Sequence, residues 1–466
     1  MSTVGPLAAS FRDPGGFVFR DEQGALLRQV NPVYEAHYRR LMDSGLYERL
    51  VDEGLLIPHE ECPLERALTP EAVVVLAPLE VPFVSYPYEW CAAQLRDAAL
   101  LTLRIQLLAL EHGMSLKDAS AFNVQFRGAQ PVFIDTLSFE PYTEGKPWVA
   151  YGQFCRHFLA PLALMHYVDF GMNRLLRTYI DGIPLPLASR ALPWRSRLKP
   201  GLLMHLHMHA RTETKRSEGE GIEAEAAAKA SRVSKQGLLG IVDSLHGVLS
   251  GLGSVPGQTT WGDYYDHTNY SEAGADAKTR LVREYLALAA PATVWDLGAN
   301  TGVYSALAAE LGAHCVAFDF DHGAVSALYV QEQKKTRGLL PLLLDLTNPS
   351  PSLGWAHTER DSFLQRGPVD CVMALALIHH LCIGNNVPLG KVAAFLAATC
   401  RYLIIEFVPK EDTKVMRMLA AREDVFPDYT QAQFLTAFGA HFSVEAESPL
   451  DDTHRTMYLM KNNRNK

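Results

Sequence analysis

The chain has 466 residues, more than a single hydrophobic core usually organises, so we expect two domains and a connection between them. Hydrophobic residues make up 48% of the chain and charged residues 20%, which excludes a disordered or fibrous protein. The formal net charge of −9 excludes a generally basic surface, so we expect no nucleic-acid partner.

The cysteines and the first residues indicate the compartment. The seven cysteines are scattered and none belongs to a CxxC pair, so we expect reduced thiols rather than a disulfide framework or a zinc knuckle. The opening MSTVGPLAASFRDPGG lacks the basic start and apolar run of a secretion signal. No uninterrupted apolar stretch is long enough to span a bilayer. We therefore expect a cytoplasmic protein without a membrane span.

Residues 1–210 are expected to form a mixed α/β domain. Short apolar runs predict strands at Gly16–Arg20, Ala72–Leu76 and Pro131–Ile134, and a longer periodic pattern predicts a helix at Gln94–His112. Residues 211–255 are expected to be a linker with a short helix. The first part of this stretch is charged and rich in alanine, so it cannot bury enough surface to join a core.

Three polar residues of the first domain stand in the order that protein-kinase-like enzymes use for their base and metal ligands. Asp118 and Asn123 lie in LKDASAFNVQF, and Asp135 ends the apolar run PVFID. The pattern resembles a protein kinase, and the resemblance implies a kinase-related scaffold. A chance match in an unrelated α/β domain is the alternative, because short spaced patterns are permissive.

The same region departs from the kinase pattern in several places. The usual His-Arg before the first acid is Leu116-Lys117, and the glycine of the DFG motif is Leu137. DPGGFVF is not a GxGxxG loop, and Arg28 is the nearest replacement for the phosphate-binding lysine. We therefore predict a substrate-binding or regulatory module that binds nucleotide weakly at most and transfers no phosphate.

Three histidines close the first domain. His205, His207 and His209 alternate in LLMHLHMHA, a spacing that is compatible with one face of a strand. No acid or cysteine cluster accompanies them, so we predict no metal site.

Residues 256–466 alternate strands with helices, which predicts a parallel sheet with helices on both faces. The last two strands are expected to form an antiparallel hairpin. The expected strands are Thr293–Leu297, His314–Phe318, Leu340–Leu344, Val369–Ala374, Tyr402–Glu406, Phe442–Glu447 and Arg455–Met460.

A glycine-rich turn follows the first of these strands. VWDLGANTGVYSALAAEL passes through Asp296, Gly298, Asn300 and Gly302 before it continues as a helix. Glycine allows positive φ and a close approach of the backbone to a ligand. Asp319 follows the next expected strand, where a carboxylate can accept both ribose hydroxyls of a nucleoside.

These motifs resemble class I S-adenosylmethionine (SAM) dependent methyltransferases over roughly the last 200 residues. The resemblance implies that Asp296–Gly302 packs against the methionine part of SAM and that Asp319 binds the ribose. It implies that Asp345 recognises the adenine amino group, with Leu346 beside the ring. Asp370 with CVMALALIHHL matches the fourth motif, whose end faces the sulfonium and the acceptor. A Rossmann dehydrogenase is disfavoured because DLGANTG is not GxGxxG.

The acceptor side is less specific. His379 and His380 end the fourth motif, where an imidazole can act as a general base, although packing or a backbone hydrogen bond would also explain them. Glu406 ends the strand YLIIEF and is expected to line the same pocket, or to cap a helix. Tyr270 lies in an aromatic segment that often folds over the cofactor in this family. The NPPY or DPPY signature of amino methylation is missing, which favours an oxygen acceptor.

Both halves together, with SFEPY, YGQFCRHFLAPL and IEFVPKED, are similar to bacterial proteins related to the nodulation protein NoeA. The resulting prediction is a SAM-dependent methyltransferase that acts on an oxygen of a small molecule or glycan. A protein methyltransferase and a SAM-binding regulatory protein without turnover are the alternatives. The sequence leaves the oligomeric state open.

Overall fold

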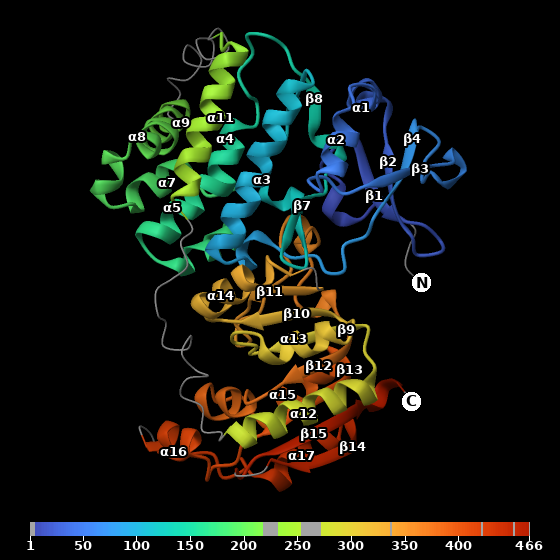
Figure 1. Ribbon diagram of the computed structural model, residues 1–466, viewed down its shortest axis with the longest axis vertical. Coiled ribbons are helices and arrows are strands. Elements are labelled where there is room, and N and C mark those ends of the chain that lie inside the picture. The colour runs from blue at the N-terminus through green and yellow to red at the C-terminus, as the bar shows by residue number, and fades with distance from the viewer. Residues whose placement is uncertain are drawn as a thin grey trace. The chain divides into compact units, whose positions relative to one another are not determined.

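The computed structural model describes residues 5–217, 232–252, 272–335, 338–420, 423–450 and 453–465. By its internal contacts the chain divides into two units, whose elements are labelled in Figure 1. Unit 1 comprises Met1–Val255 and Ser352–Arg360, and unit 2 comprises Pro256–Pro351 and Asp361–Lys466. Within the described residues, no helix has the length and apolar character needed to cross a membrane.

Unit 1 begins with an antiparallel sheet of order β1-β2-β4-β3. Phe19, Leu27 and Val75 are fully buried on one face of this sheet, since alternate strand residues point the same way. Tyr34 and Tyr38 of helix α1 pack against the other face, beside Val30 and Leu76. The elements are β1 (Gly16–Arg20), β2 (Leu26–Val30), α1 (Pro32–Asp43), α2 (Leu46–Asp52), β3 (His59–Cys62) and β4 (Val74–Pro78).

The rest of unit 1 is mainly helical and surrounds helix α3 (Ala92–Glu111), which is buried along most of its length. This helix and the strand β7 confirm the predictions for residues 94–112 and 131–134. Two short antiparallel pairs, β5 with β8 and β6 with β7, follow α3. The strands are β5 (Met114–Leu116), β6 (Val124–Arg127), β7 (Gln130–Phe133) and β8 (Phe139–Pro141), and the helices are α4 (Tyr151–Phe154), α5 (Ala160–Tyr167), α6 (Leu175–Thr178), α7 (Leu185–Ala191), α8 (Pro200–Leu202) and α9 (His209–Ser217).

Helix α11 (Lys235–Ser250) also belongs to unit 1 and packs against α3. The short helix expected within residues 211–255, near Leu238–Leu252, is therefore present. Its buried side chains contribute to the core of unit 1. Residues 211–217 of the expected linker continue α9. The buried side chains of α11 form one helical stripe: Leu238, Val242, Leu245 and Leu249.

The alternating histidines do not lie on a strand, because Leu203–Met208 is π-helical. The π-helical turn buries both His205 and His207. The ring nitrogens of His205 contact the Tyr151 hydroxyl at 2.8 Å and Ser244 Oγ at 2.9 Å. Those of His207 contact Ser189 and Ser196 at 2.8 and 2.9 Å. Hydrogen bonds within the protein therefore satisfy these imidazoles.

Unit 2 is built on a seven-stranded sheet of order β11-β10-β9-β12-β13-β15-β14. Strands β9 to β13 are parallel to one another, and β15 runs antiparallel to both β13 and β14, which confirms the predicted terminal hairpin. The strands are β9 (Thr293–Leu297), β10 (His314–Asp319), β11 (Leu339–Leu343), β12 (Val369–Ala374), β13 (Cys400–Phe407), β14 (Phe442–Pro449) and β15 (Thr456–Asn462). The helices are α12 (Glu272–Ala289), α13 (Val303–Glu310), α14 (His322–Glu332), α15 (Leu389–Ala397), α16 (Thr413–Ala420) and α17 (Gln431–Gly439).

The connection from β11 to β12 leaves unit 2 and contributes residues 352–360 to unit 1. Glu359 is 4% exposed and accepts hydrogen bonds from Nε and Nη2 of Arg12, at 3.1 and 2.6 Å. The guanidinium of Arg360 lies 4.4 Å from the ring centroid of Phe122. Local sequence patterns could not predict that residues 352–360 join unit 1, because these contacts join residues more than 200 positions apart.

Acidification should destabilise unit 1 through His205. Burial, with a smaller contribution from His209, lowers the pKa of His205 to about 4, whereas the unfolded value is about 6.5. Between those pH values His205 is protonated in the unfolded chain but neutral in the folded unit. The free energy of unfolding therefore falls as the pH falls below about 6.5. The full loss should be about 2 to 3 kcal/mol near pH 4.

Thermal melting of the wild type between pH 7.5 and 5 measures this loss. The variant His205→Gln should show a shallower fall with pH, whereas His246→Gln, which changes an exposed histidine of α11, should follow the wild type. Equal pH dependence in all three proteins would contradict the assignment.

Candidate active site

The turn between β9 and α13 has the backbone geometry that its sequence predicts. Gly298, Asn300 and Gly302 have φ of 78°, 51° and 76°. A Cβ on Gly302 would lie 2.5 Å from the side chain of Leu328, so both conformation and space require glycine there. Asp296 lies before the turn, is 2% exposed and accepts a 2.6 Å hydrogen bond from Ser305 Oγ. Burial raises the pKa of Asp296 to about 6.

Asp319 joins this turn to the next strand. It ends β10, is 8% exposed, and its carboxylate accepts the backbone N–H of Asn300 at 2.8 Å and of Asp321 at 2.9 Å. Burial raises the pKa of Asp319, and the two amides oppose that rise. A carboxylate has about four lone-pair positions, so the bound amides leave acceptor capacity for ligand hydroxyls.

Asp345 and Leu346 lie at the same edge of the sheet. Asp319 pairs in register with Leu343, the last residue of β11, and Asp345 follows two residues later. Its Oδ1 accepts hydrogen bonds from the Thr347 backbone at 2.9 Å and hydroxyl at 2.6 Å, which fixes the turn. Both Asp345 and Leu346 remain partly exposed.

Asp370 lies at the opposite edge. Its Oδ2 accepts hydrogen bonds from the backbone of Ala292 and Thr293, both at 3.0 Å, and from Thr293 Oγ1 at 3.1 Å. These residues begin β12 and β9, whereas the predicted cofactor residues follow the strand ends. Asp370 therefore aligns two strands and contributes no group to the candidate site.

His379 and His380 follow β12 at the cofactor edge, and their ring centroids are 4.2 Å apart. His379 is fully buried, and neither ring nitrogen has a hydrogen-bond partner among the described residues. Burial, followed by the neighbouring His380, lowers its pKa far below the usual range. His380 is partly exposed, and burial with the charge of Lys414 lowers its pKa to about 4. Both imidazoles are thus neutral at pH 7, and His380 is the more accessible.

Glu406 is fully buried in an ion-pair network that the sequence did not reveal. Its two carboxylate oxygens accept hydrogen bonds from Lys278 Nζ at 2.6 Å and Arg455 Nη1 at 3.0 Å. Arg455 also donates from Nε to Asp412 at 2.8 Å. A carboxylate that two cations hold in this way is a poor base, so this geometry does not support the expected catalytic role.

The network reaches the predicted cofactor turn through Lys278. Its ammonium lies 4.9 Å from the ring centroid of Tyr304, the second residue of α13. Burial lowers the pKa of Lys278, and Glu406 opposes this effect. Lys278 stands on α12 and Arg455 immediately precedes β15, the second strand of the terminal hairpin, so no local motif could have identified either residue. Tyr270 lies outside the described residues, as does the aromatic segment around it.

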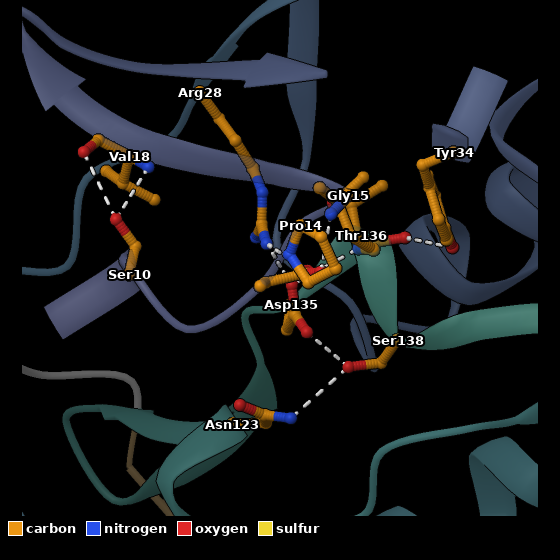
Figure 2. Close-up of polar contacts among 12 residues, drawn as sticks. Ser10, Pro14, Gly15, Val18, Arg28, Tyr34, Asn123, Asp135, Thr136 and Ser138 are labelled. Atoms are coloured by element: carbon orange, nitrogen blue, oxygen red, sulfur yellow. Dashed lines mark hydrogen bonds and ion pairs between the residues drawn. The ribbon is translucent and has the colours of Figure 1, made fainter. Parts of the chain in front are cut away.

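A second polar cluster lies in unit 1 and contains Asn123 and Asp135, two of the kinase-like residues (Figure 2). Arg28 of β2 forms an ion pair with Asp135 at 2.5 Å. The hydroxyl of Ser138 donates to Asp135 and accepts a 3.2 Å hydrogen bond from Asn123 Nδ2. Burial, followed by the charge of Asp135, raises the pKa of Asp118.

The charge of Asp135 is thus neutralised inside the protein. Burial alone would raise the pKa of Asp135, but Arg28 and Ser138 lower it. In the described part of the chain, no group of three or more His, Cys, Asp or Glu side chains has the arrangement of a metal site. Arg28 supplies a positive charge that faces Asp135.

The sheet of unit 2 and its site define a protein class. Five parallel strands, a reversed last strand, and acids at the ends of β10 and β11 beside a glycine turn make an α/β fold of the class I methyltransferase type. No family model matches the chain. It is 36% identical over 461 residues to the nodulation protein NoeA of Rhizobium meliloti (strain 1021), which covers 98% of this chain and 96% of that protein. The chain therefore belongs to the NoeA family.

Solved structures match less than half of the chain. The magnesium protoporphyrin IX methyltransferase ChlM of Synechocystis PCC 6803, with bound SAH, is 17% identical with a TM-score of 0.31, over 43% of this chain and 92% of that one. The bifunctional kinase-methyltransferase WbdD is 17% identical with a TM-score of 0.30, over 45% of this chain and 43% of that one. The PH0226 protein of Pyrococcus horikoshii OT3 is 15% identical with a TM-score of 0.31, over 44% of this chain and 100% of that one.

Removing the charge of Lys278 should strongly destabilise unit 2. In Lys278→Met the buried Glu406 loses one of the two cations that contact its carboxylate, and a broken buried pair costs on the order of 3 kcal/mol. Arg283→Met is the matched control, because Arg283 lies on the same helix as Lys278 but forms an exposed ion pair, with Glu310 of α13. Its loss should cost less than about 1 kcal/mol. Urea unfolding measures both free energies. Equal losses would show that the network contributes no special stability.

Proposed function

We propose that unit 2 binds S-adenosylmethionine at the carboxyl edge of β9, β10 and β11 and transfers its methyl group to an acceptor. The observation that carries this proposal is the position of Asp319. It ends β10 with a buried carboxylate that is held by the amides of Asn300 and Asp321, directly beside a turn with positive φ. A fixed carboxylate in that place suits the two hydroxyls of a ribose.

Each cofactor residue has a distinct part in the proposal. The backbone of Gly298–Gly302, with Asp296 beneath it, would face the methionine end of SAM. Asp319 would accept the ribose hydroxyls, Asp345 would accept the adenine amino group, and Leu346 would pack on the ring. Tyr270 would cover the cofactor. The activated methyl group itself is supplied by SAM, so the protein positions the acceptor and moves its proton.

For the acceptor we propose an oxygen of a small molecule or glycan. A hydroxyl must lose its proton as the methyl group arrives, and His380, a partly exposed residue with a neutral imidazole, would accept it. His379 would stand behind His380, since their rings lie 4.2 Å apart. Glu406 would anchor Arg455 and Lys278 instead of acting as a base. A protein acceptor, and a SAM-binding regulator without turnover, remain the alternatives.

For the first half of the chain we propose a kinase-related domain that binds substrate or regulates transfer, followed by the segment 211–255 and the methyltransferase domain 256–466. The ion pair of Arg28 with Asp135 supports this proposal, because it occupies the acid that a kinase uses for metal. Phosphate transfer would instead require the Asp135 carboxylate to leave its ion pair with Arg28 so that it could bind a metal ion.

Binding of SAM should depend on Asp319 and not on Asp370. Asp319→Ala removes the ribose carboxylate and should weaken SAM binding more than tenfold, since charge-assisted hydrogen bonds of about 1.5 to 3 kcal/mol are lost. Asp370→Ala removes an acid of the opposite sheet edge and should leave the affinity unchanged. Titration calorimetry with SAM and S-adenosylhomocysteine tests both. Equal affinities would refute the site assignment.

Methyl transfer is measured by incubating the protein with SAM that carries a radioactive methyl group and with fractions of a bacterial lysate. We expect one fraction to become labelled. His380→Gln should slow this transfer by about 100-fold or more while SAM affinity stays the same, because a positioned base contributes that much. His314→Gln is the control, since His314 begins β10 at the other edge. Full activity of His380→Gln would exclude it as the base, and label in a protein band would favour the protein acceptor.

A further inference from the structure

One segment of unit 1 has a charge opposite to that of the chain. From Gly182 to Thr212 the sequence contains no Asp or Glu, although the whole chain carries −9. The same segment contains five Arg or Lys residues, and all are exposed. None of them has an ion-pair partner among the described residues. They are Arg190, Arg195, Arg197, Lys199 and Arg211.

Large apolar side chains are exposed in the same segment. Trp194 is 74% exposed and Leu198 67% exposed, on the 3-10 helix that spans Trp194–Leu198. Met204 and Met208 of the following π-helical turn are 48% and 54% exposed, and Leu203 is 38% exposed. A single exposed apolar residue needs no explanation, but five within fifteen positions do.

The backbone beneath these side chains is fixed. Ser196 Oγ contacts a ring nitrogen of His207 at 2.9 Å, and Ser189 contacts the other ring nitrogen at 2.8 Å. Ser196 and His207 are both buried, so the 3-10 helix, α7 and the π-helical turn are joined on their inner side. The exposed residues therefore stand on a preformed surface, and ordering it costs little on binding.

We propose that the segment Gly182–Thr212, the basic apolar segment, docks on an anionic lipid surface. Aromatic and aliphatic side chains enter the boundary between headgroups and acyl chains, and flanking Arg and Lys attract acidic headgroups. Charge complementarity favours lipid here, because a chain of net −9 is repelled by an anionic surface except where a local cationic face meets it. This proposal does not depend on the proposed methyl transfer.

Sedimentation of the full chain with lipid vesicles tests the proposal. Vesicles that contain phosphatidylglycerol should bind the protein, and vesicles of phosphatidylcholine alone should bind far less. Neutralising Arg195, Arg197 and Lys199 to Gln should lower partitioning on the order of 100-fold. Neutralising the exposed but ion-paired Arg39, Arg49 and Arg104 removes the same charge elsewhere in unit 1 and should have a much smaller effect.

The exposed apolar side chains of the basic apolar segment are tested with a second variant and a matched control. Trp194→Ser with Leu198→Ser should lower partitioning at least about tenfold and remove the blue shift of tryptophan emission on binding. Trp355→Ser changes a side chain that is 71% exposed and should behave as wild type. Circular dichroism verifies that every variant is folded.

Three results would overturn the proposal. The first is the absence of binding to anionic vesicles. The second is equal binding by the paired charge variants or by the paired tryptophan variants. The third is a combined result: free polyglutamate displaces the protein from the vesicles, and the Trp194 and Leu198 changes do not alter vesicle binding. That result would identify an acidic polypeptide as the partner instead.

Discussion

The carboxylate of Glu406 ties together three parts of unit 2 that are distant in sequence. Lys278 comes from the helix before the sheet, Glu406 is the penultimate residue of β13, and Arg455 immediately precedes β15 of the terminal hairpin. Charges buried this deeply are tolerated only when each has a partner, so the three elements must assemble together. The position of α12 beside the glycine turn follows from this requirement, since the ammonium of Lys278 also lies over the ring of Tyr304.

The two edges of the unit 2 sheet carry acids with different roles. At the amino edge, Asp370 aligns β9 and β12 through hydrogen bonds to the backbone, and both strands are fixed by it. At the carboxyl edge, Asp319 binds the amides of the turn while keeping lone pairs free for a ligand. Parallel strands present all their carboxyl ends together, which is why ligands of such sheets gather there. The proposed SAM site uses this property of the fold.

In unit 1, an ion pair with Arg28 compensates the charge of Asp135. Asp118, Asn123 and Asp135 stand near one another as the kinase resemblance implies, but Arg28 and Ser138 engage Asp135. An arginine holds its charge at any physiological pH, so it neutralises the acid permanently. The exposed cations of the segment 182–212 have no such partners among the described residues.

The sequence by itself determined which segments of unit 2 form strands, the antiparallel last pair and the acids that lie at the ends of β10 and β11. These features depend on local periodicity and on the positions of turns, which neighbouring residues encode. Only the tertiary structure decided the roles of Glu406, Lys278 and Arg455, because their partners are more than 40 residues away. It also decided that His205 and His207 face inward from a π-helical turn, where alternation in sequence had suggested a strand. The distinction is physical: local patterns specify which elements form, whereas burial and pairing of charge depend on what those elements meet when they pack.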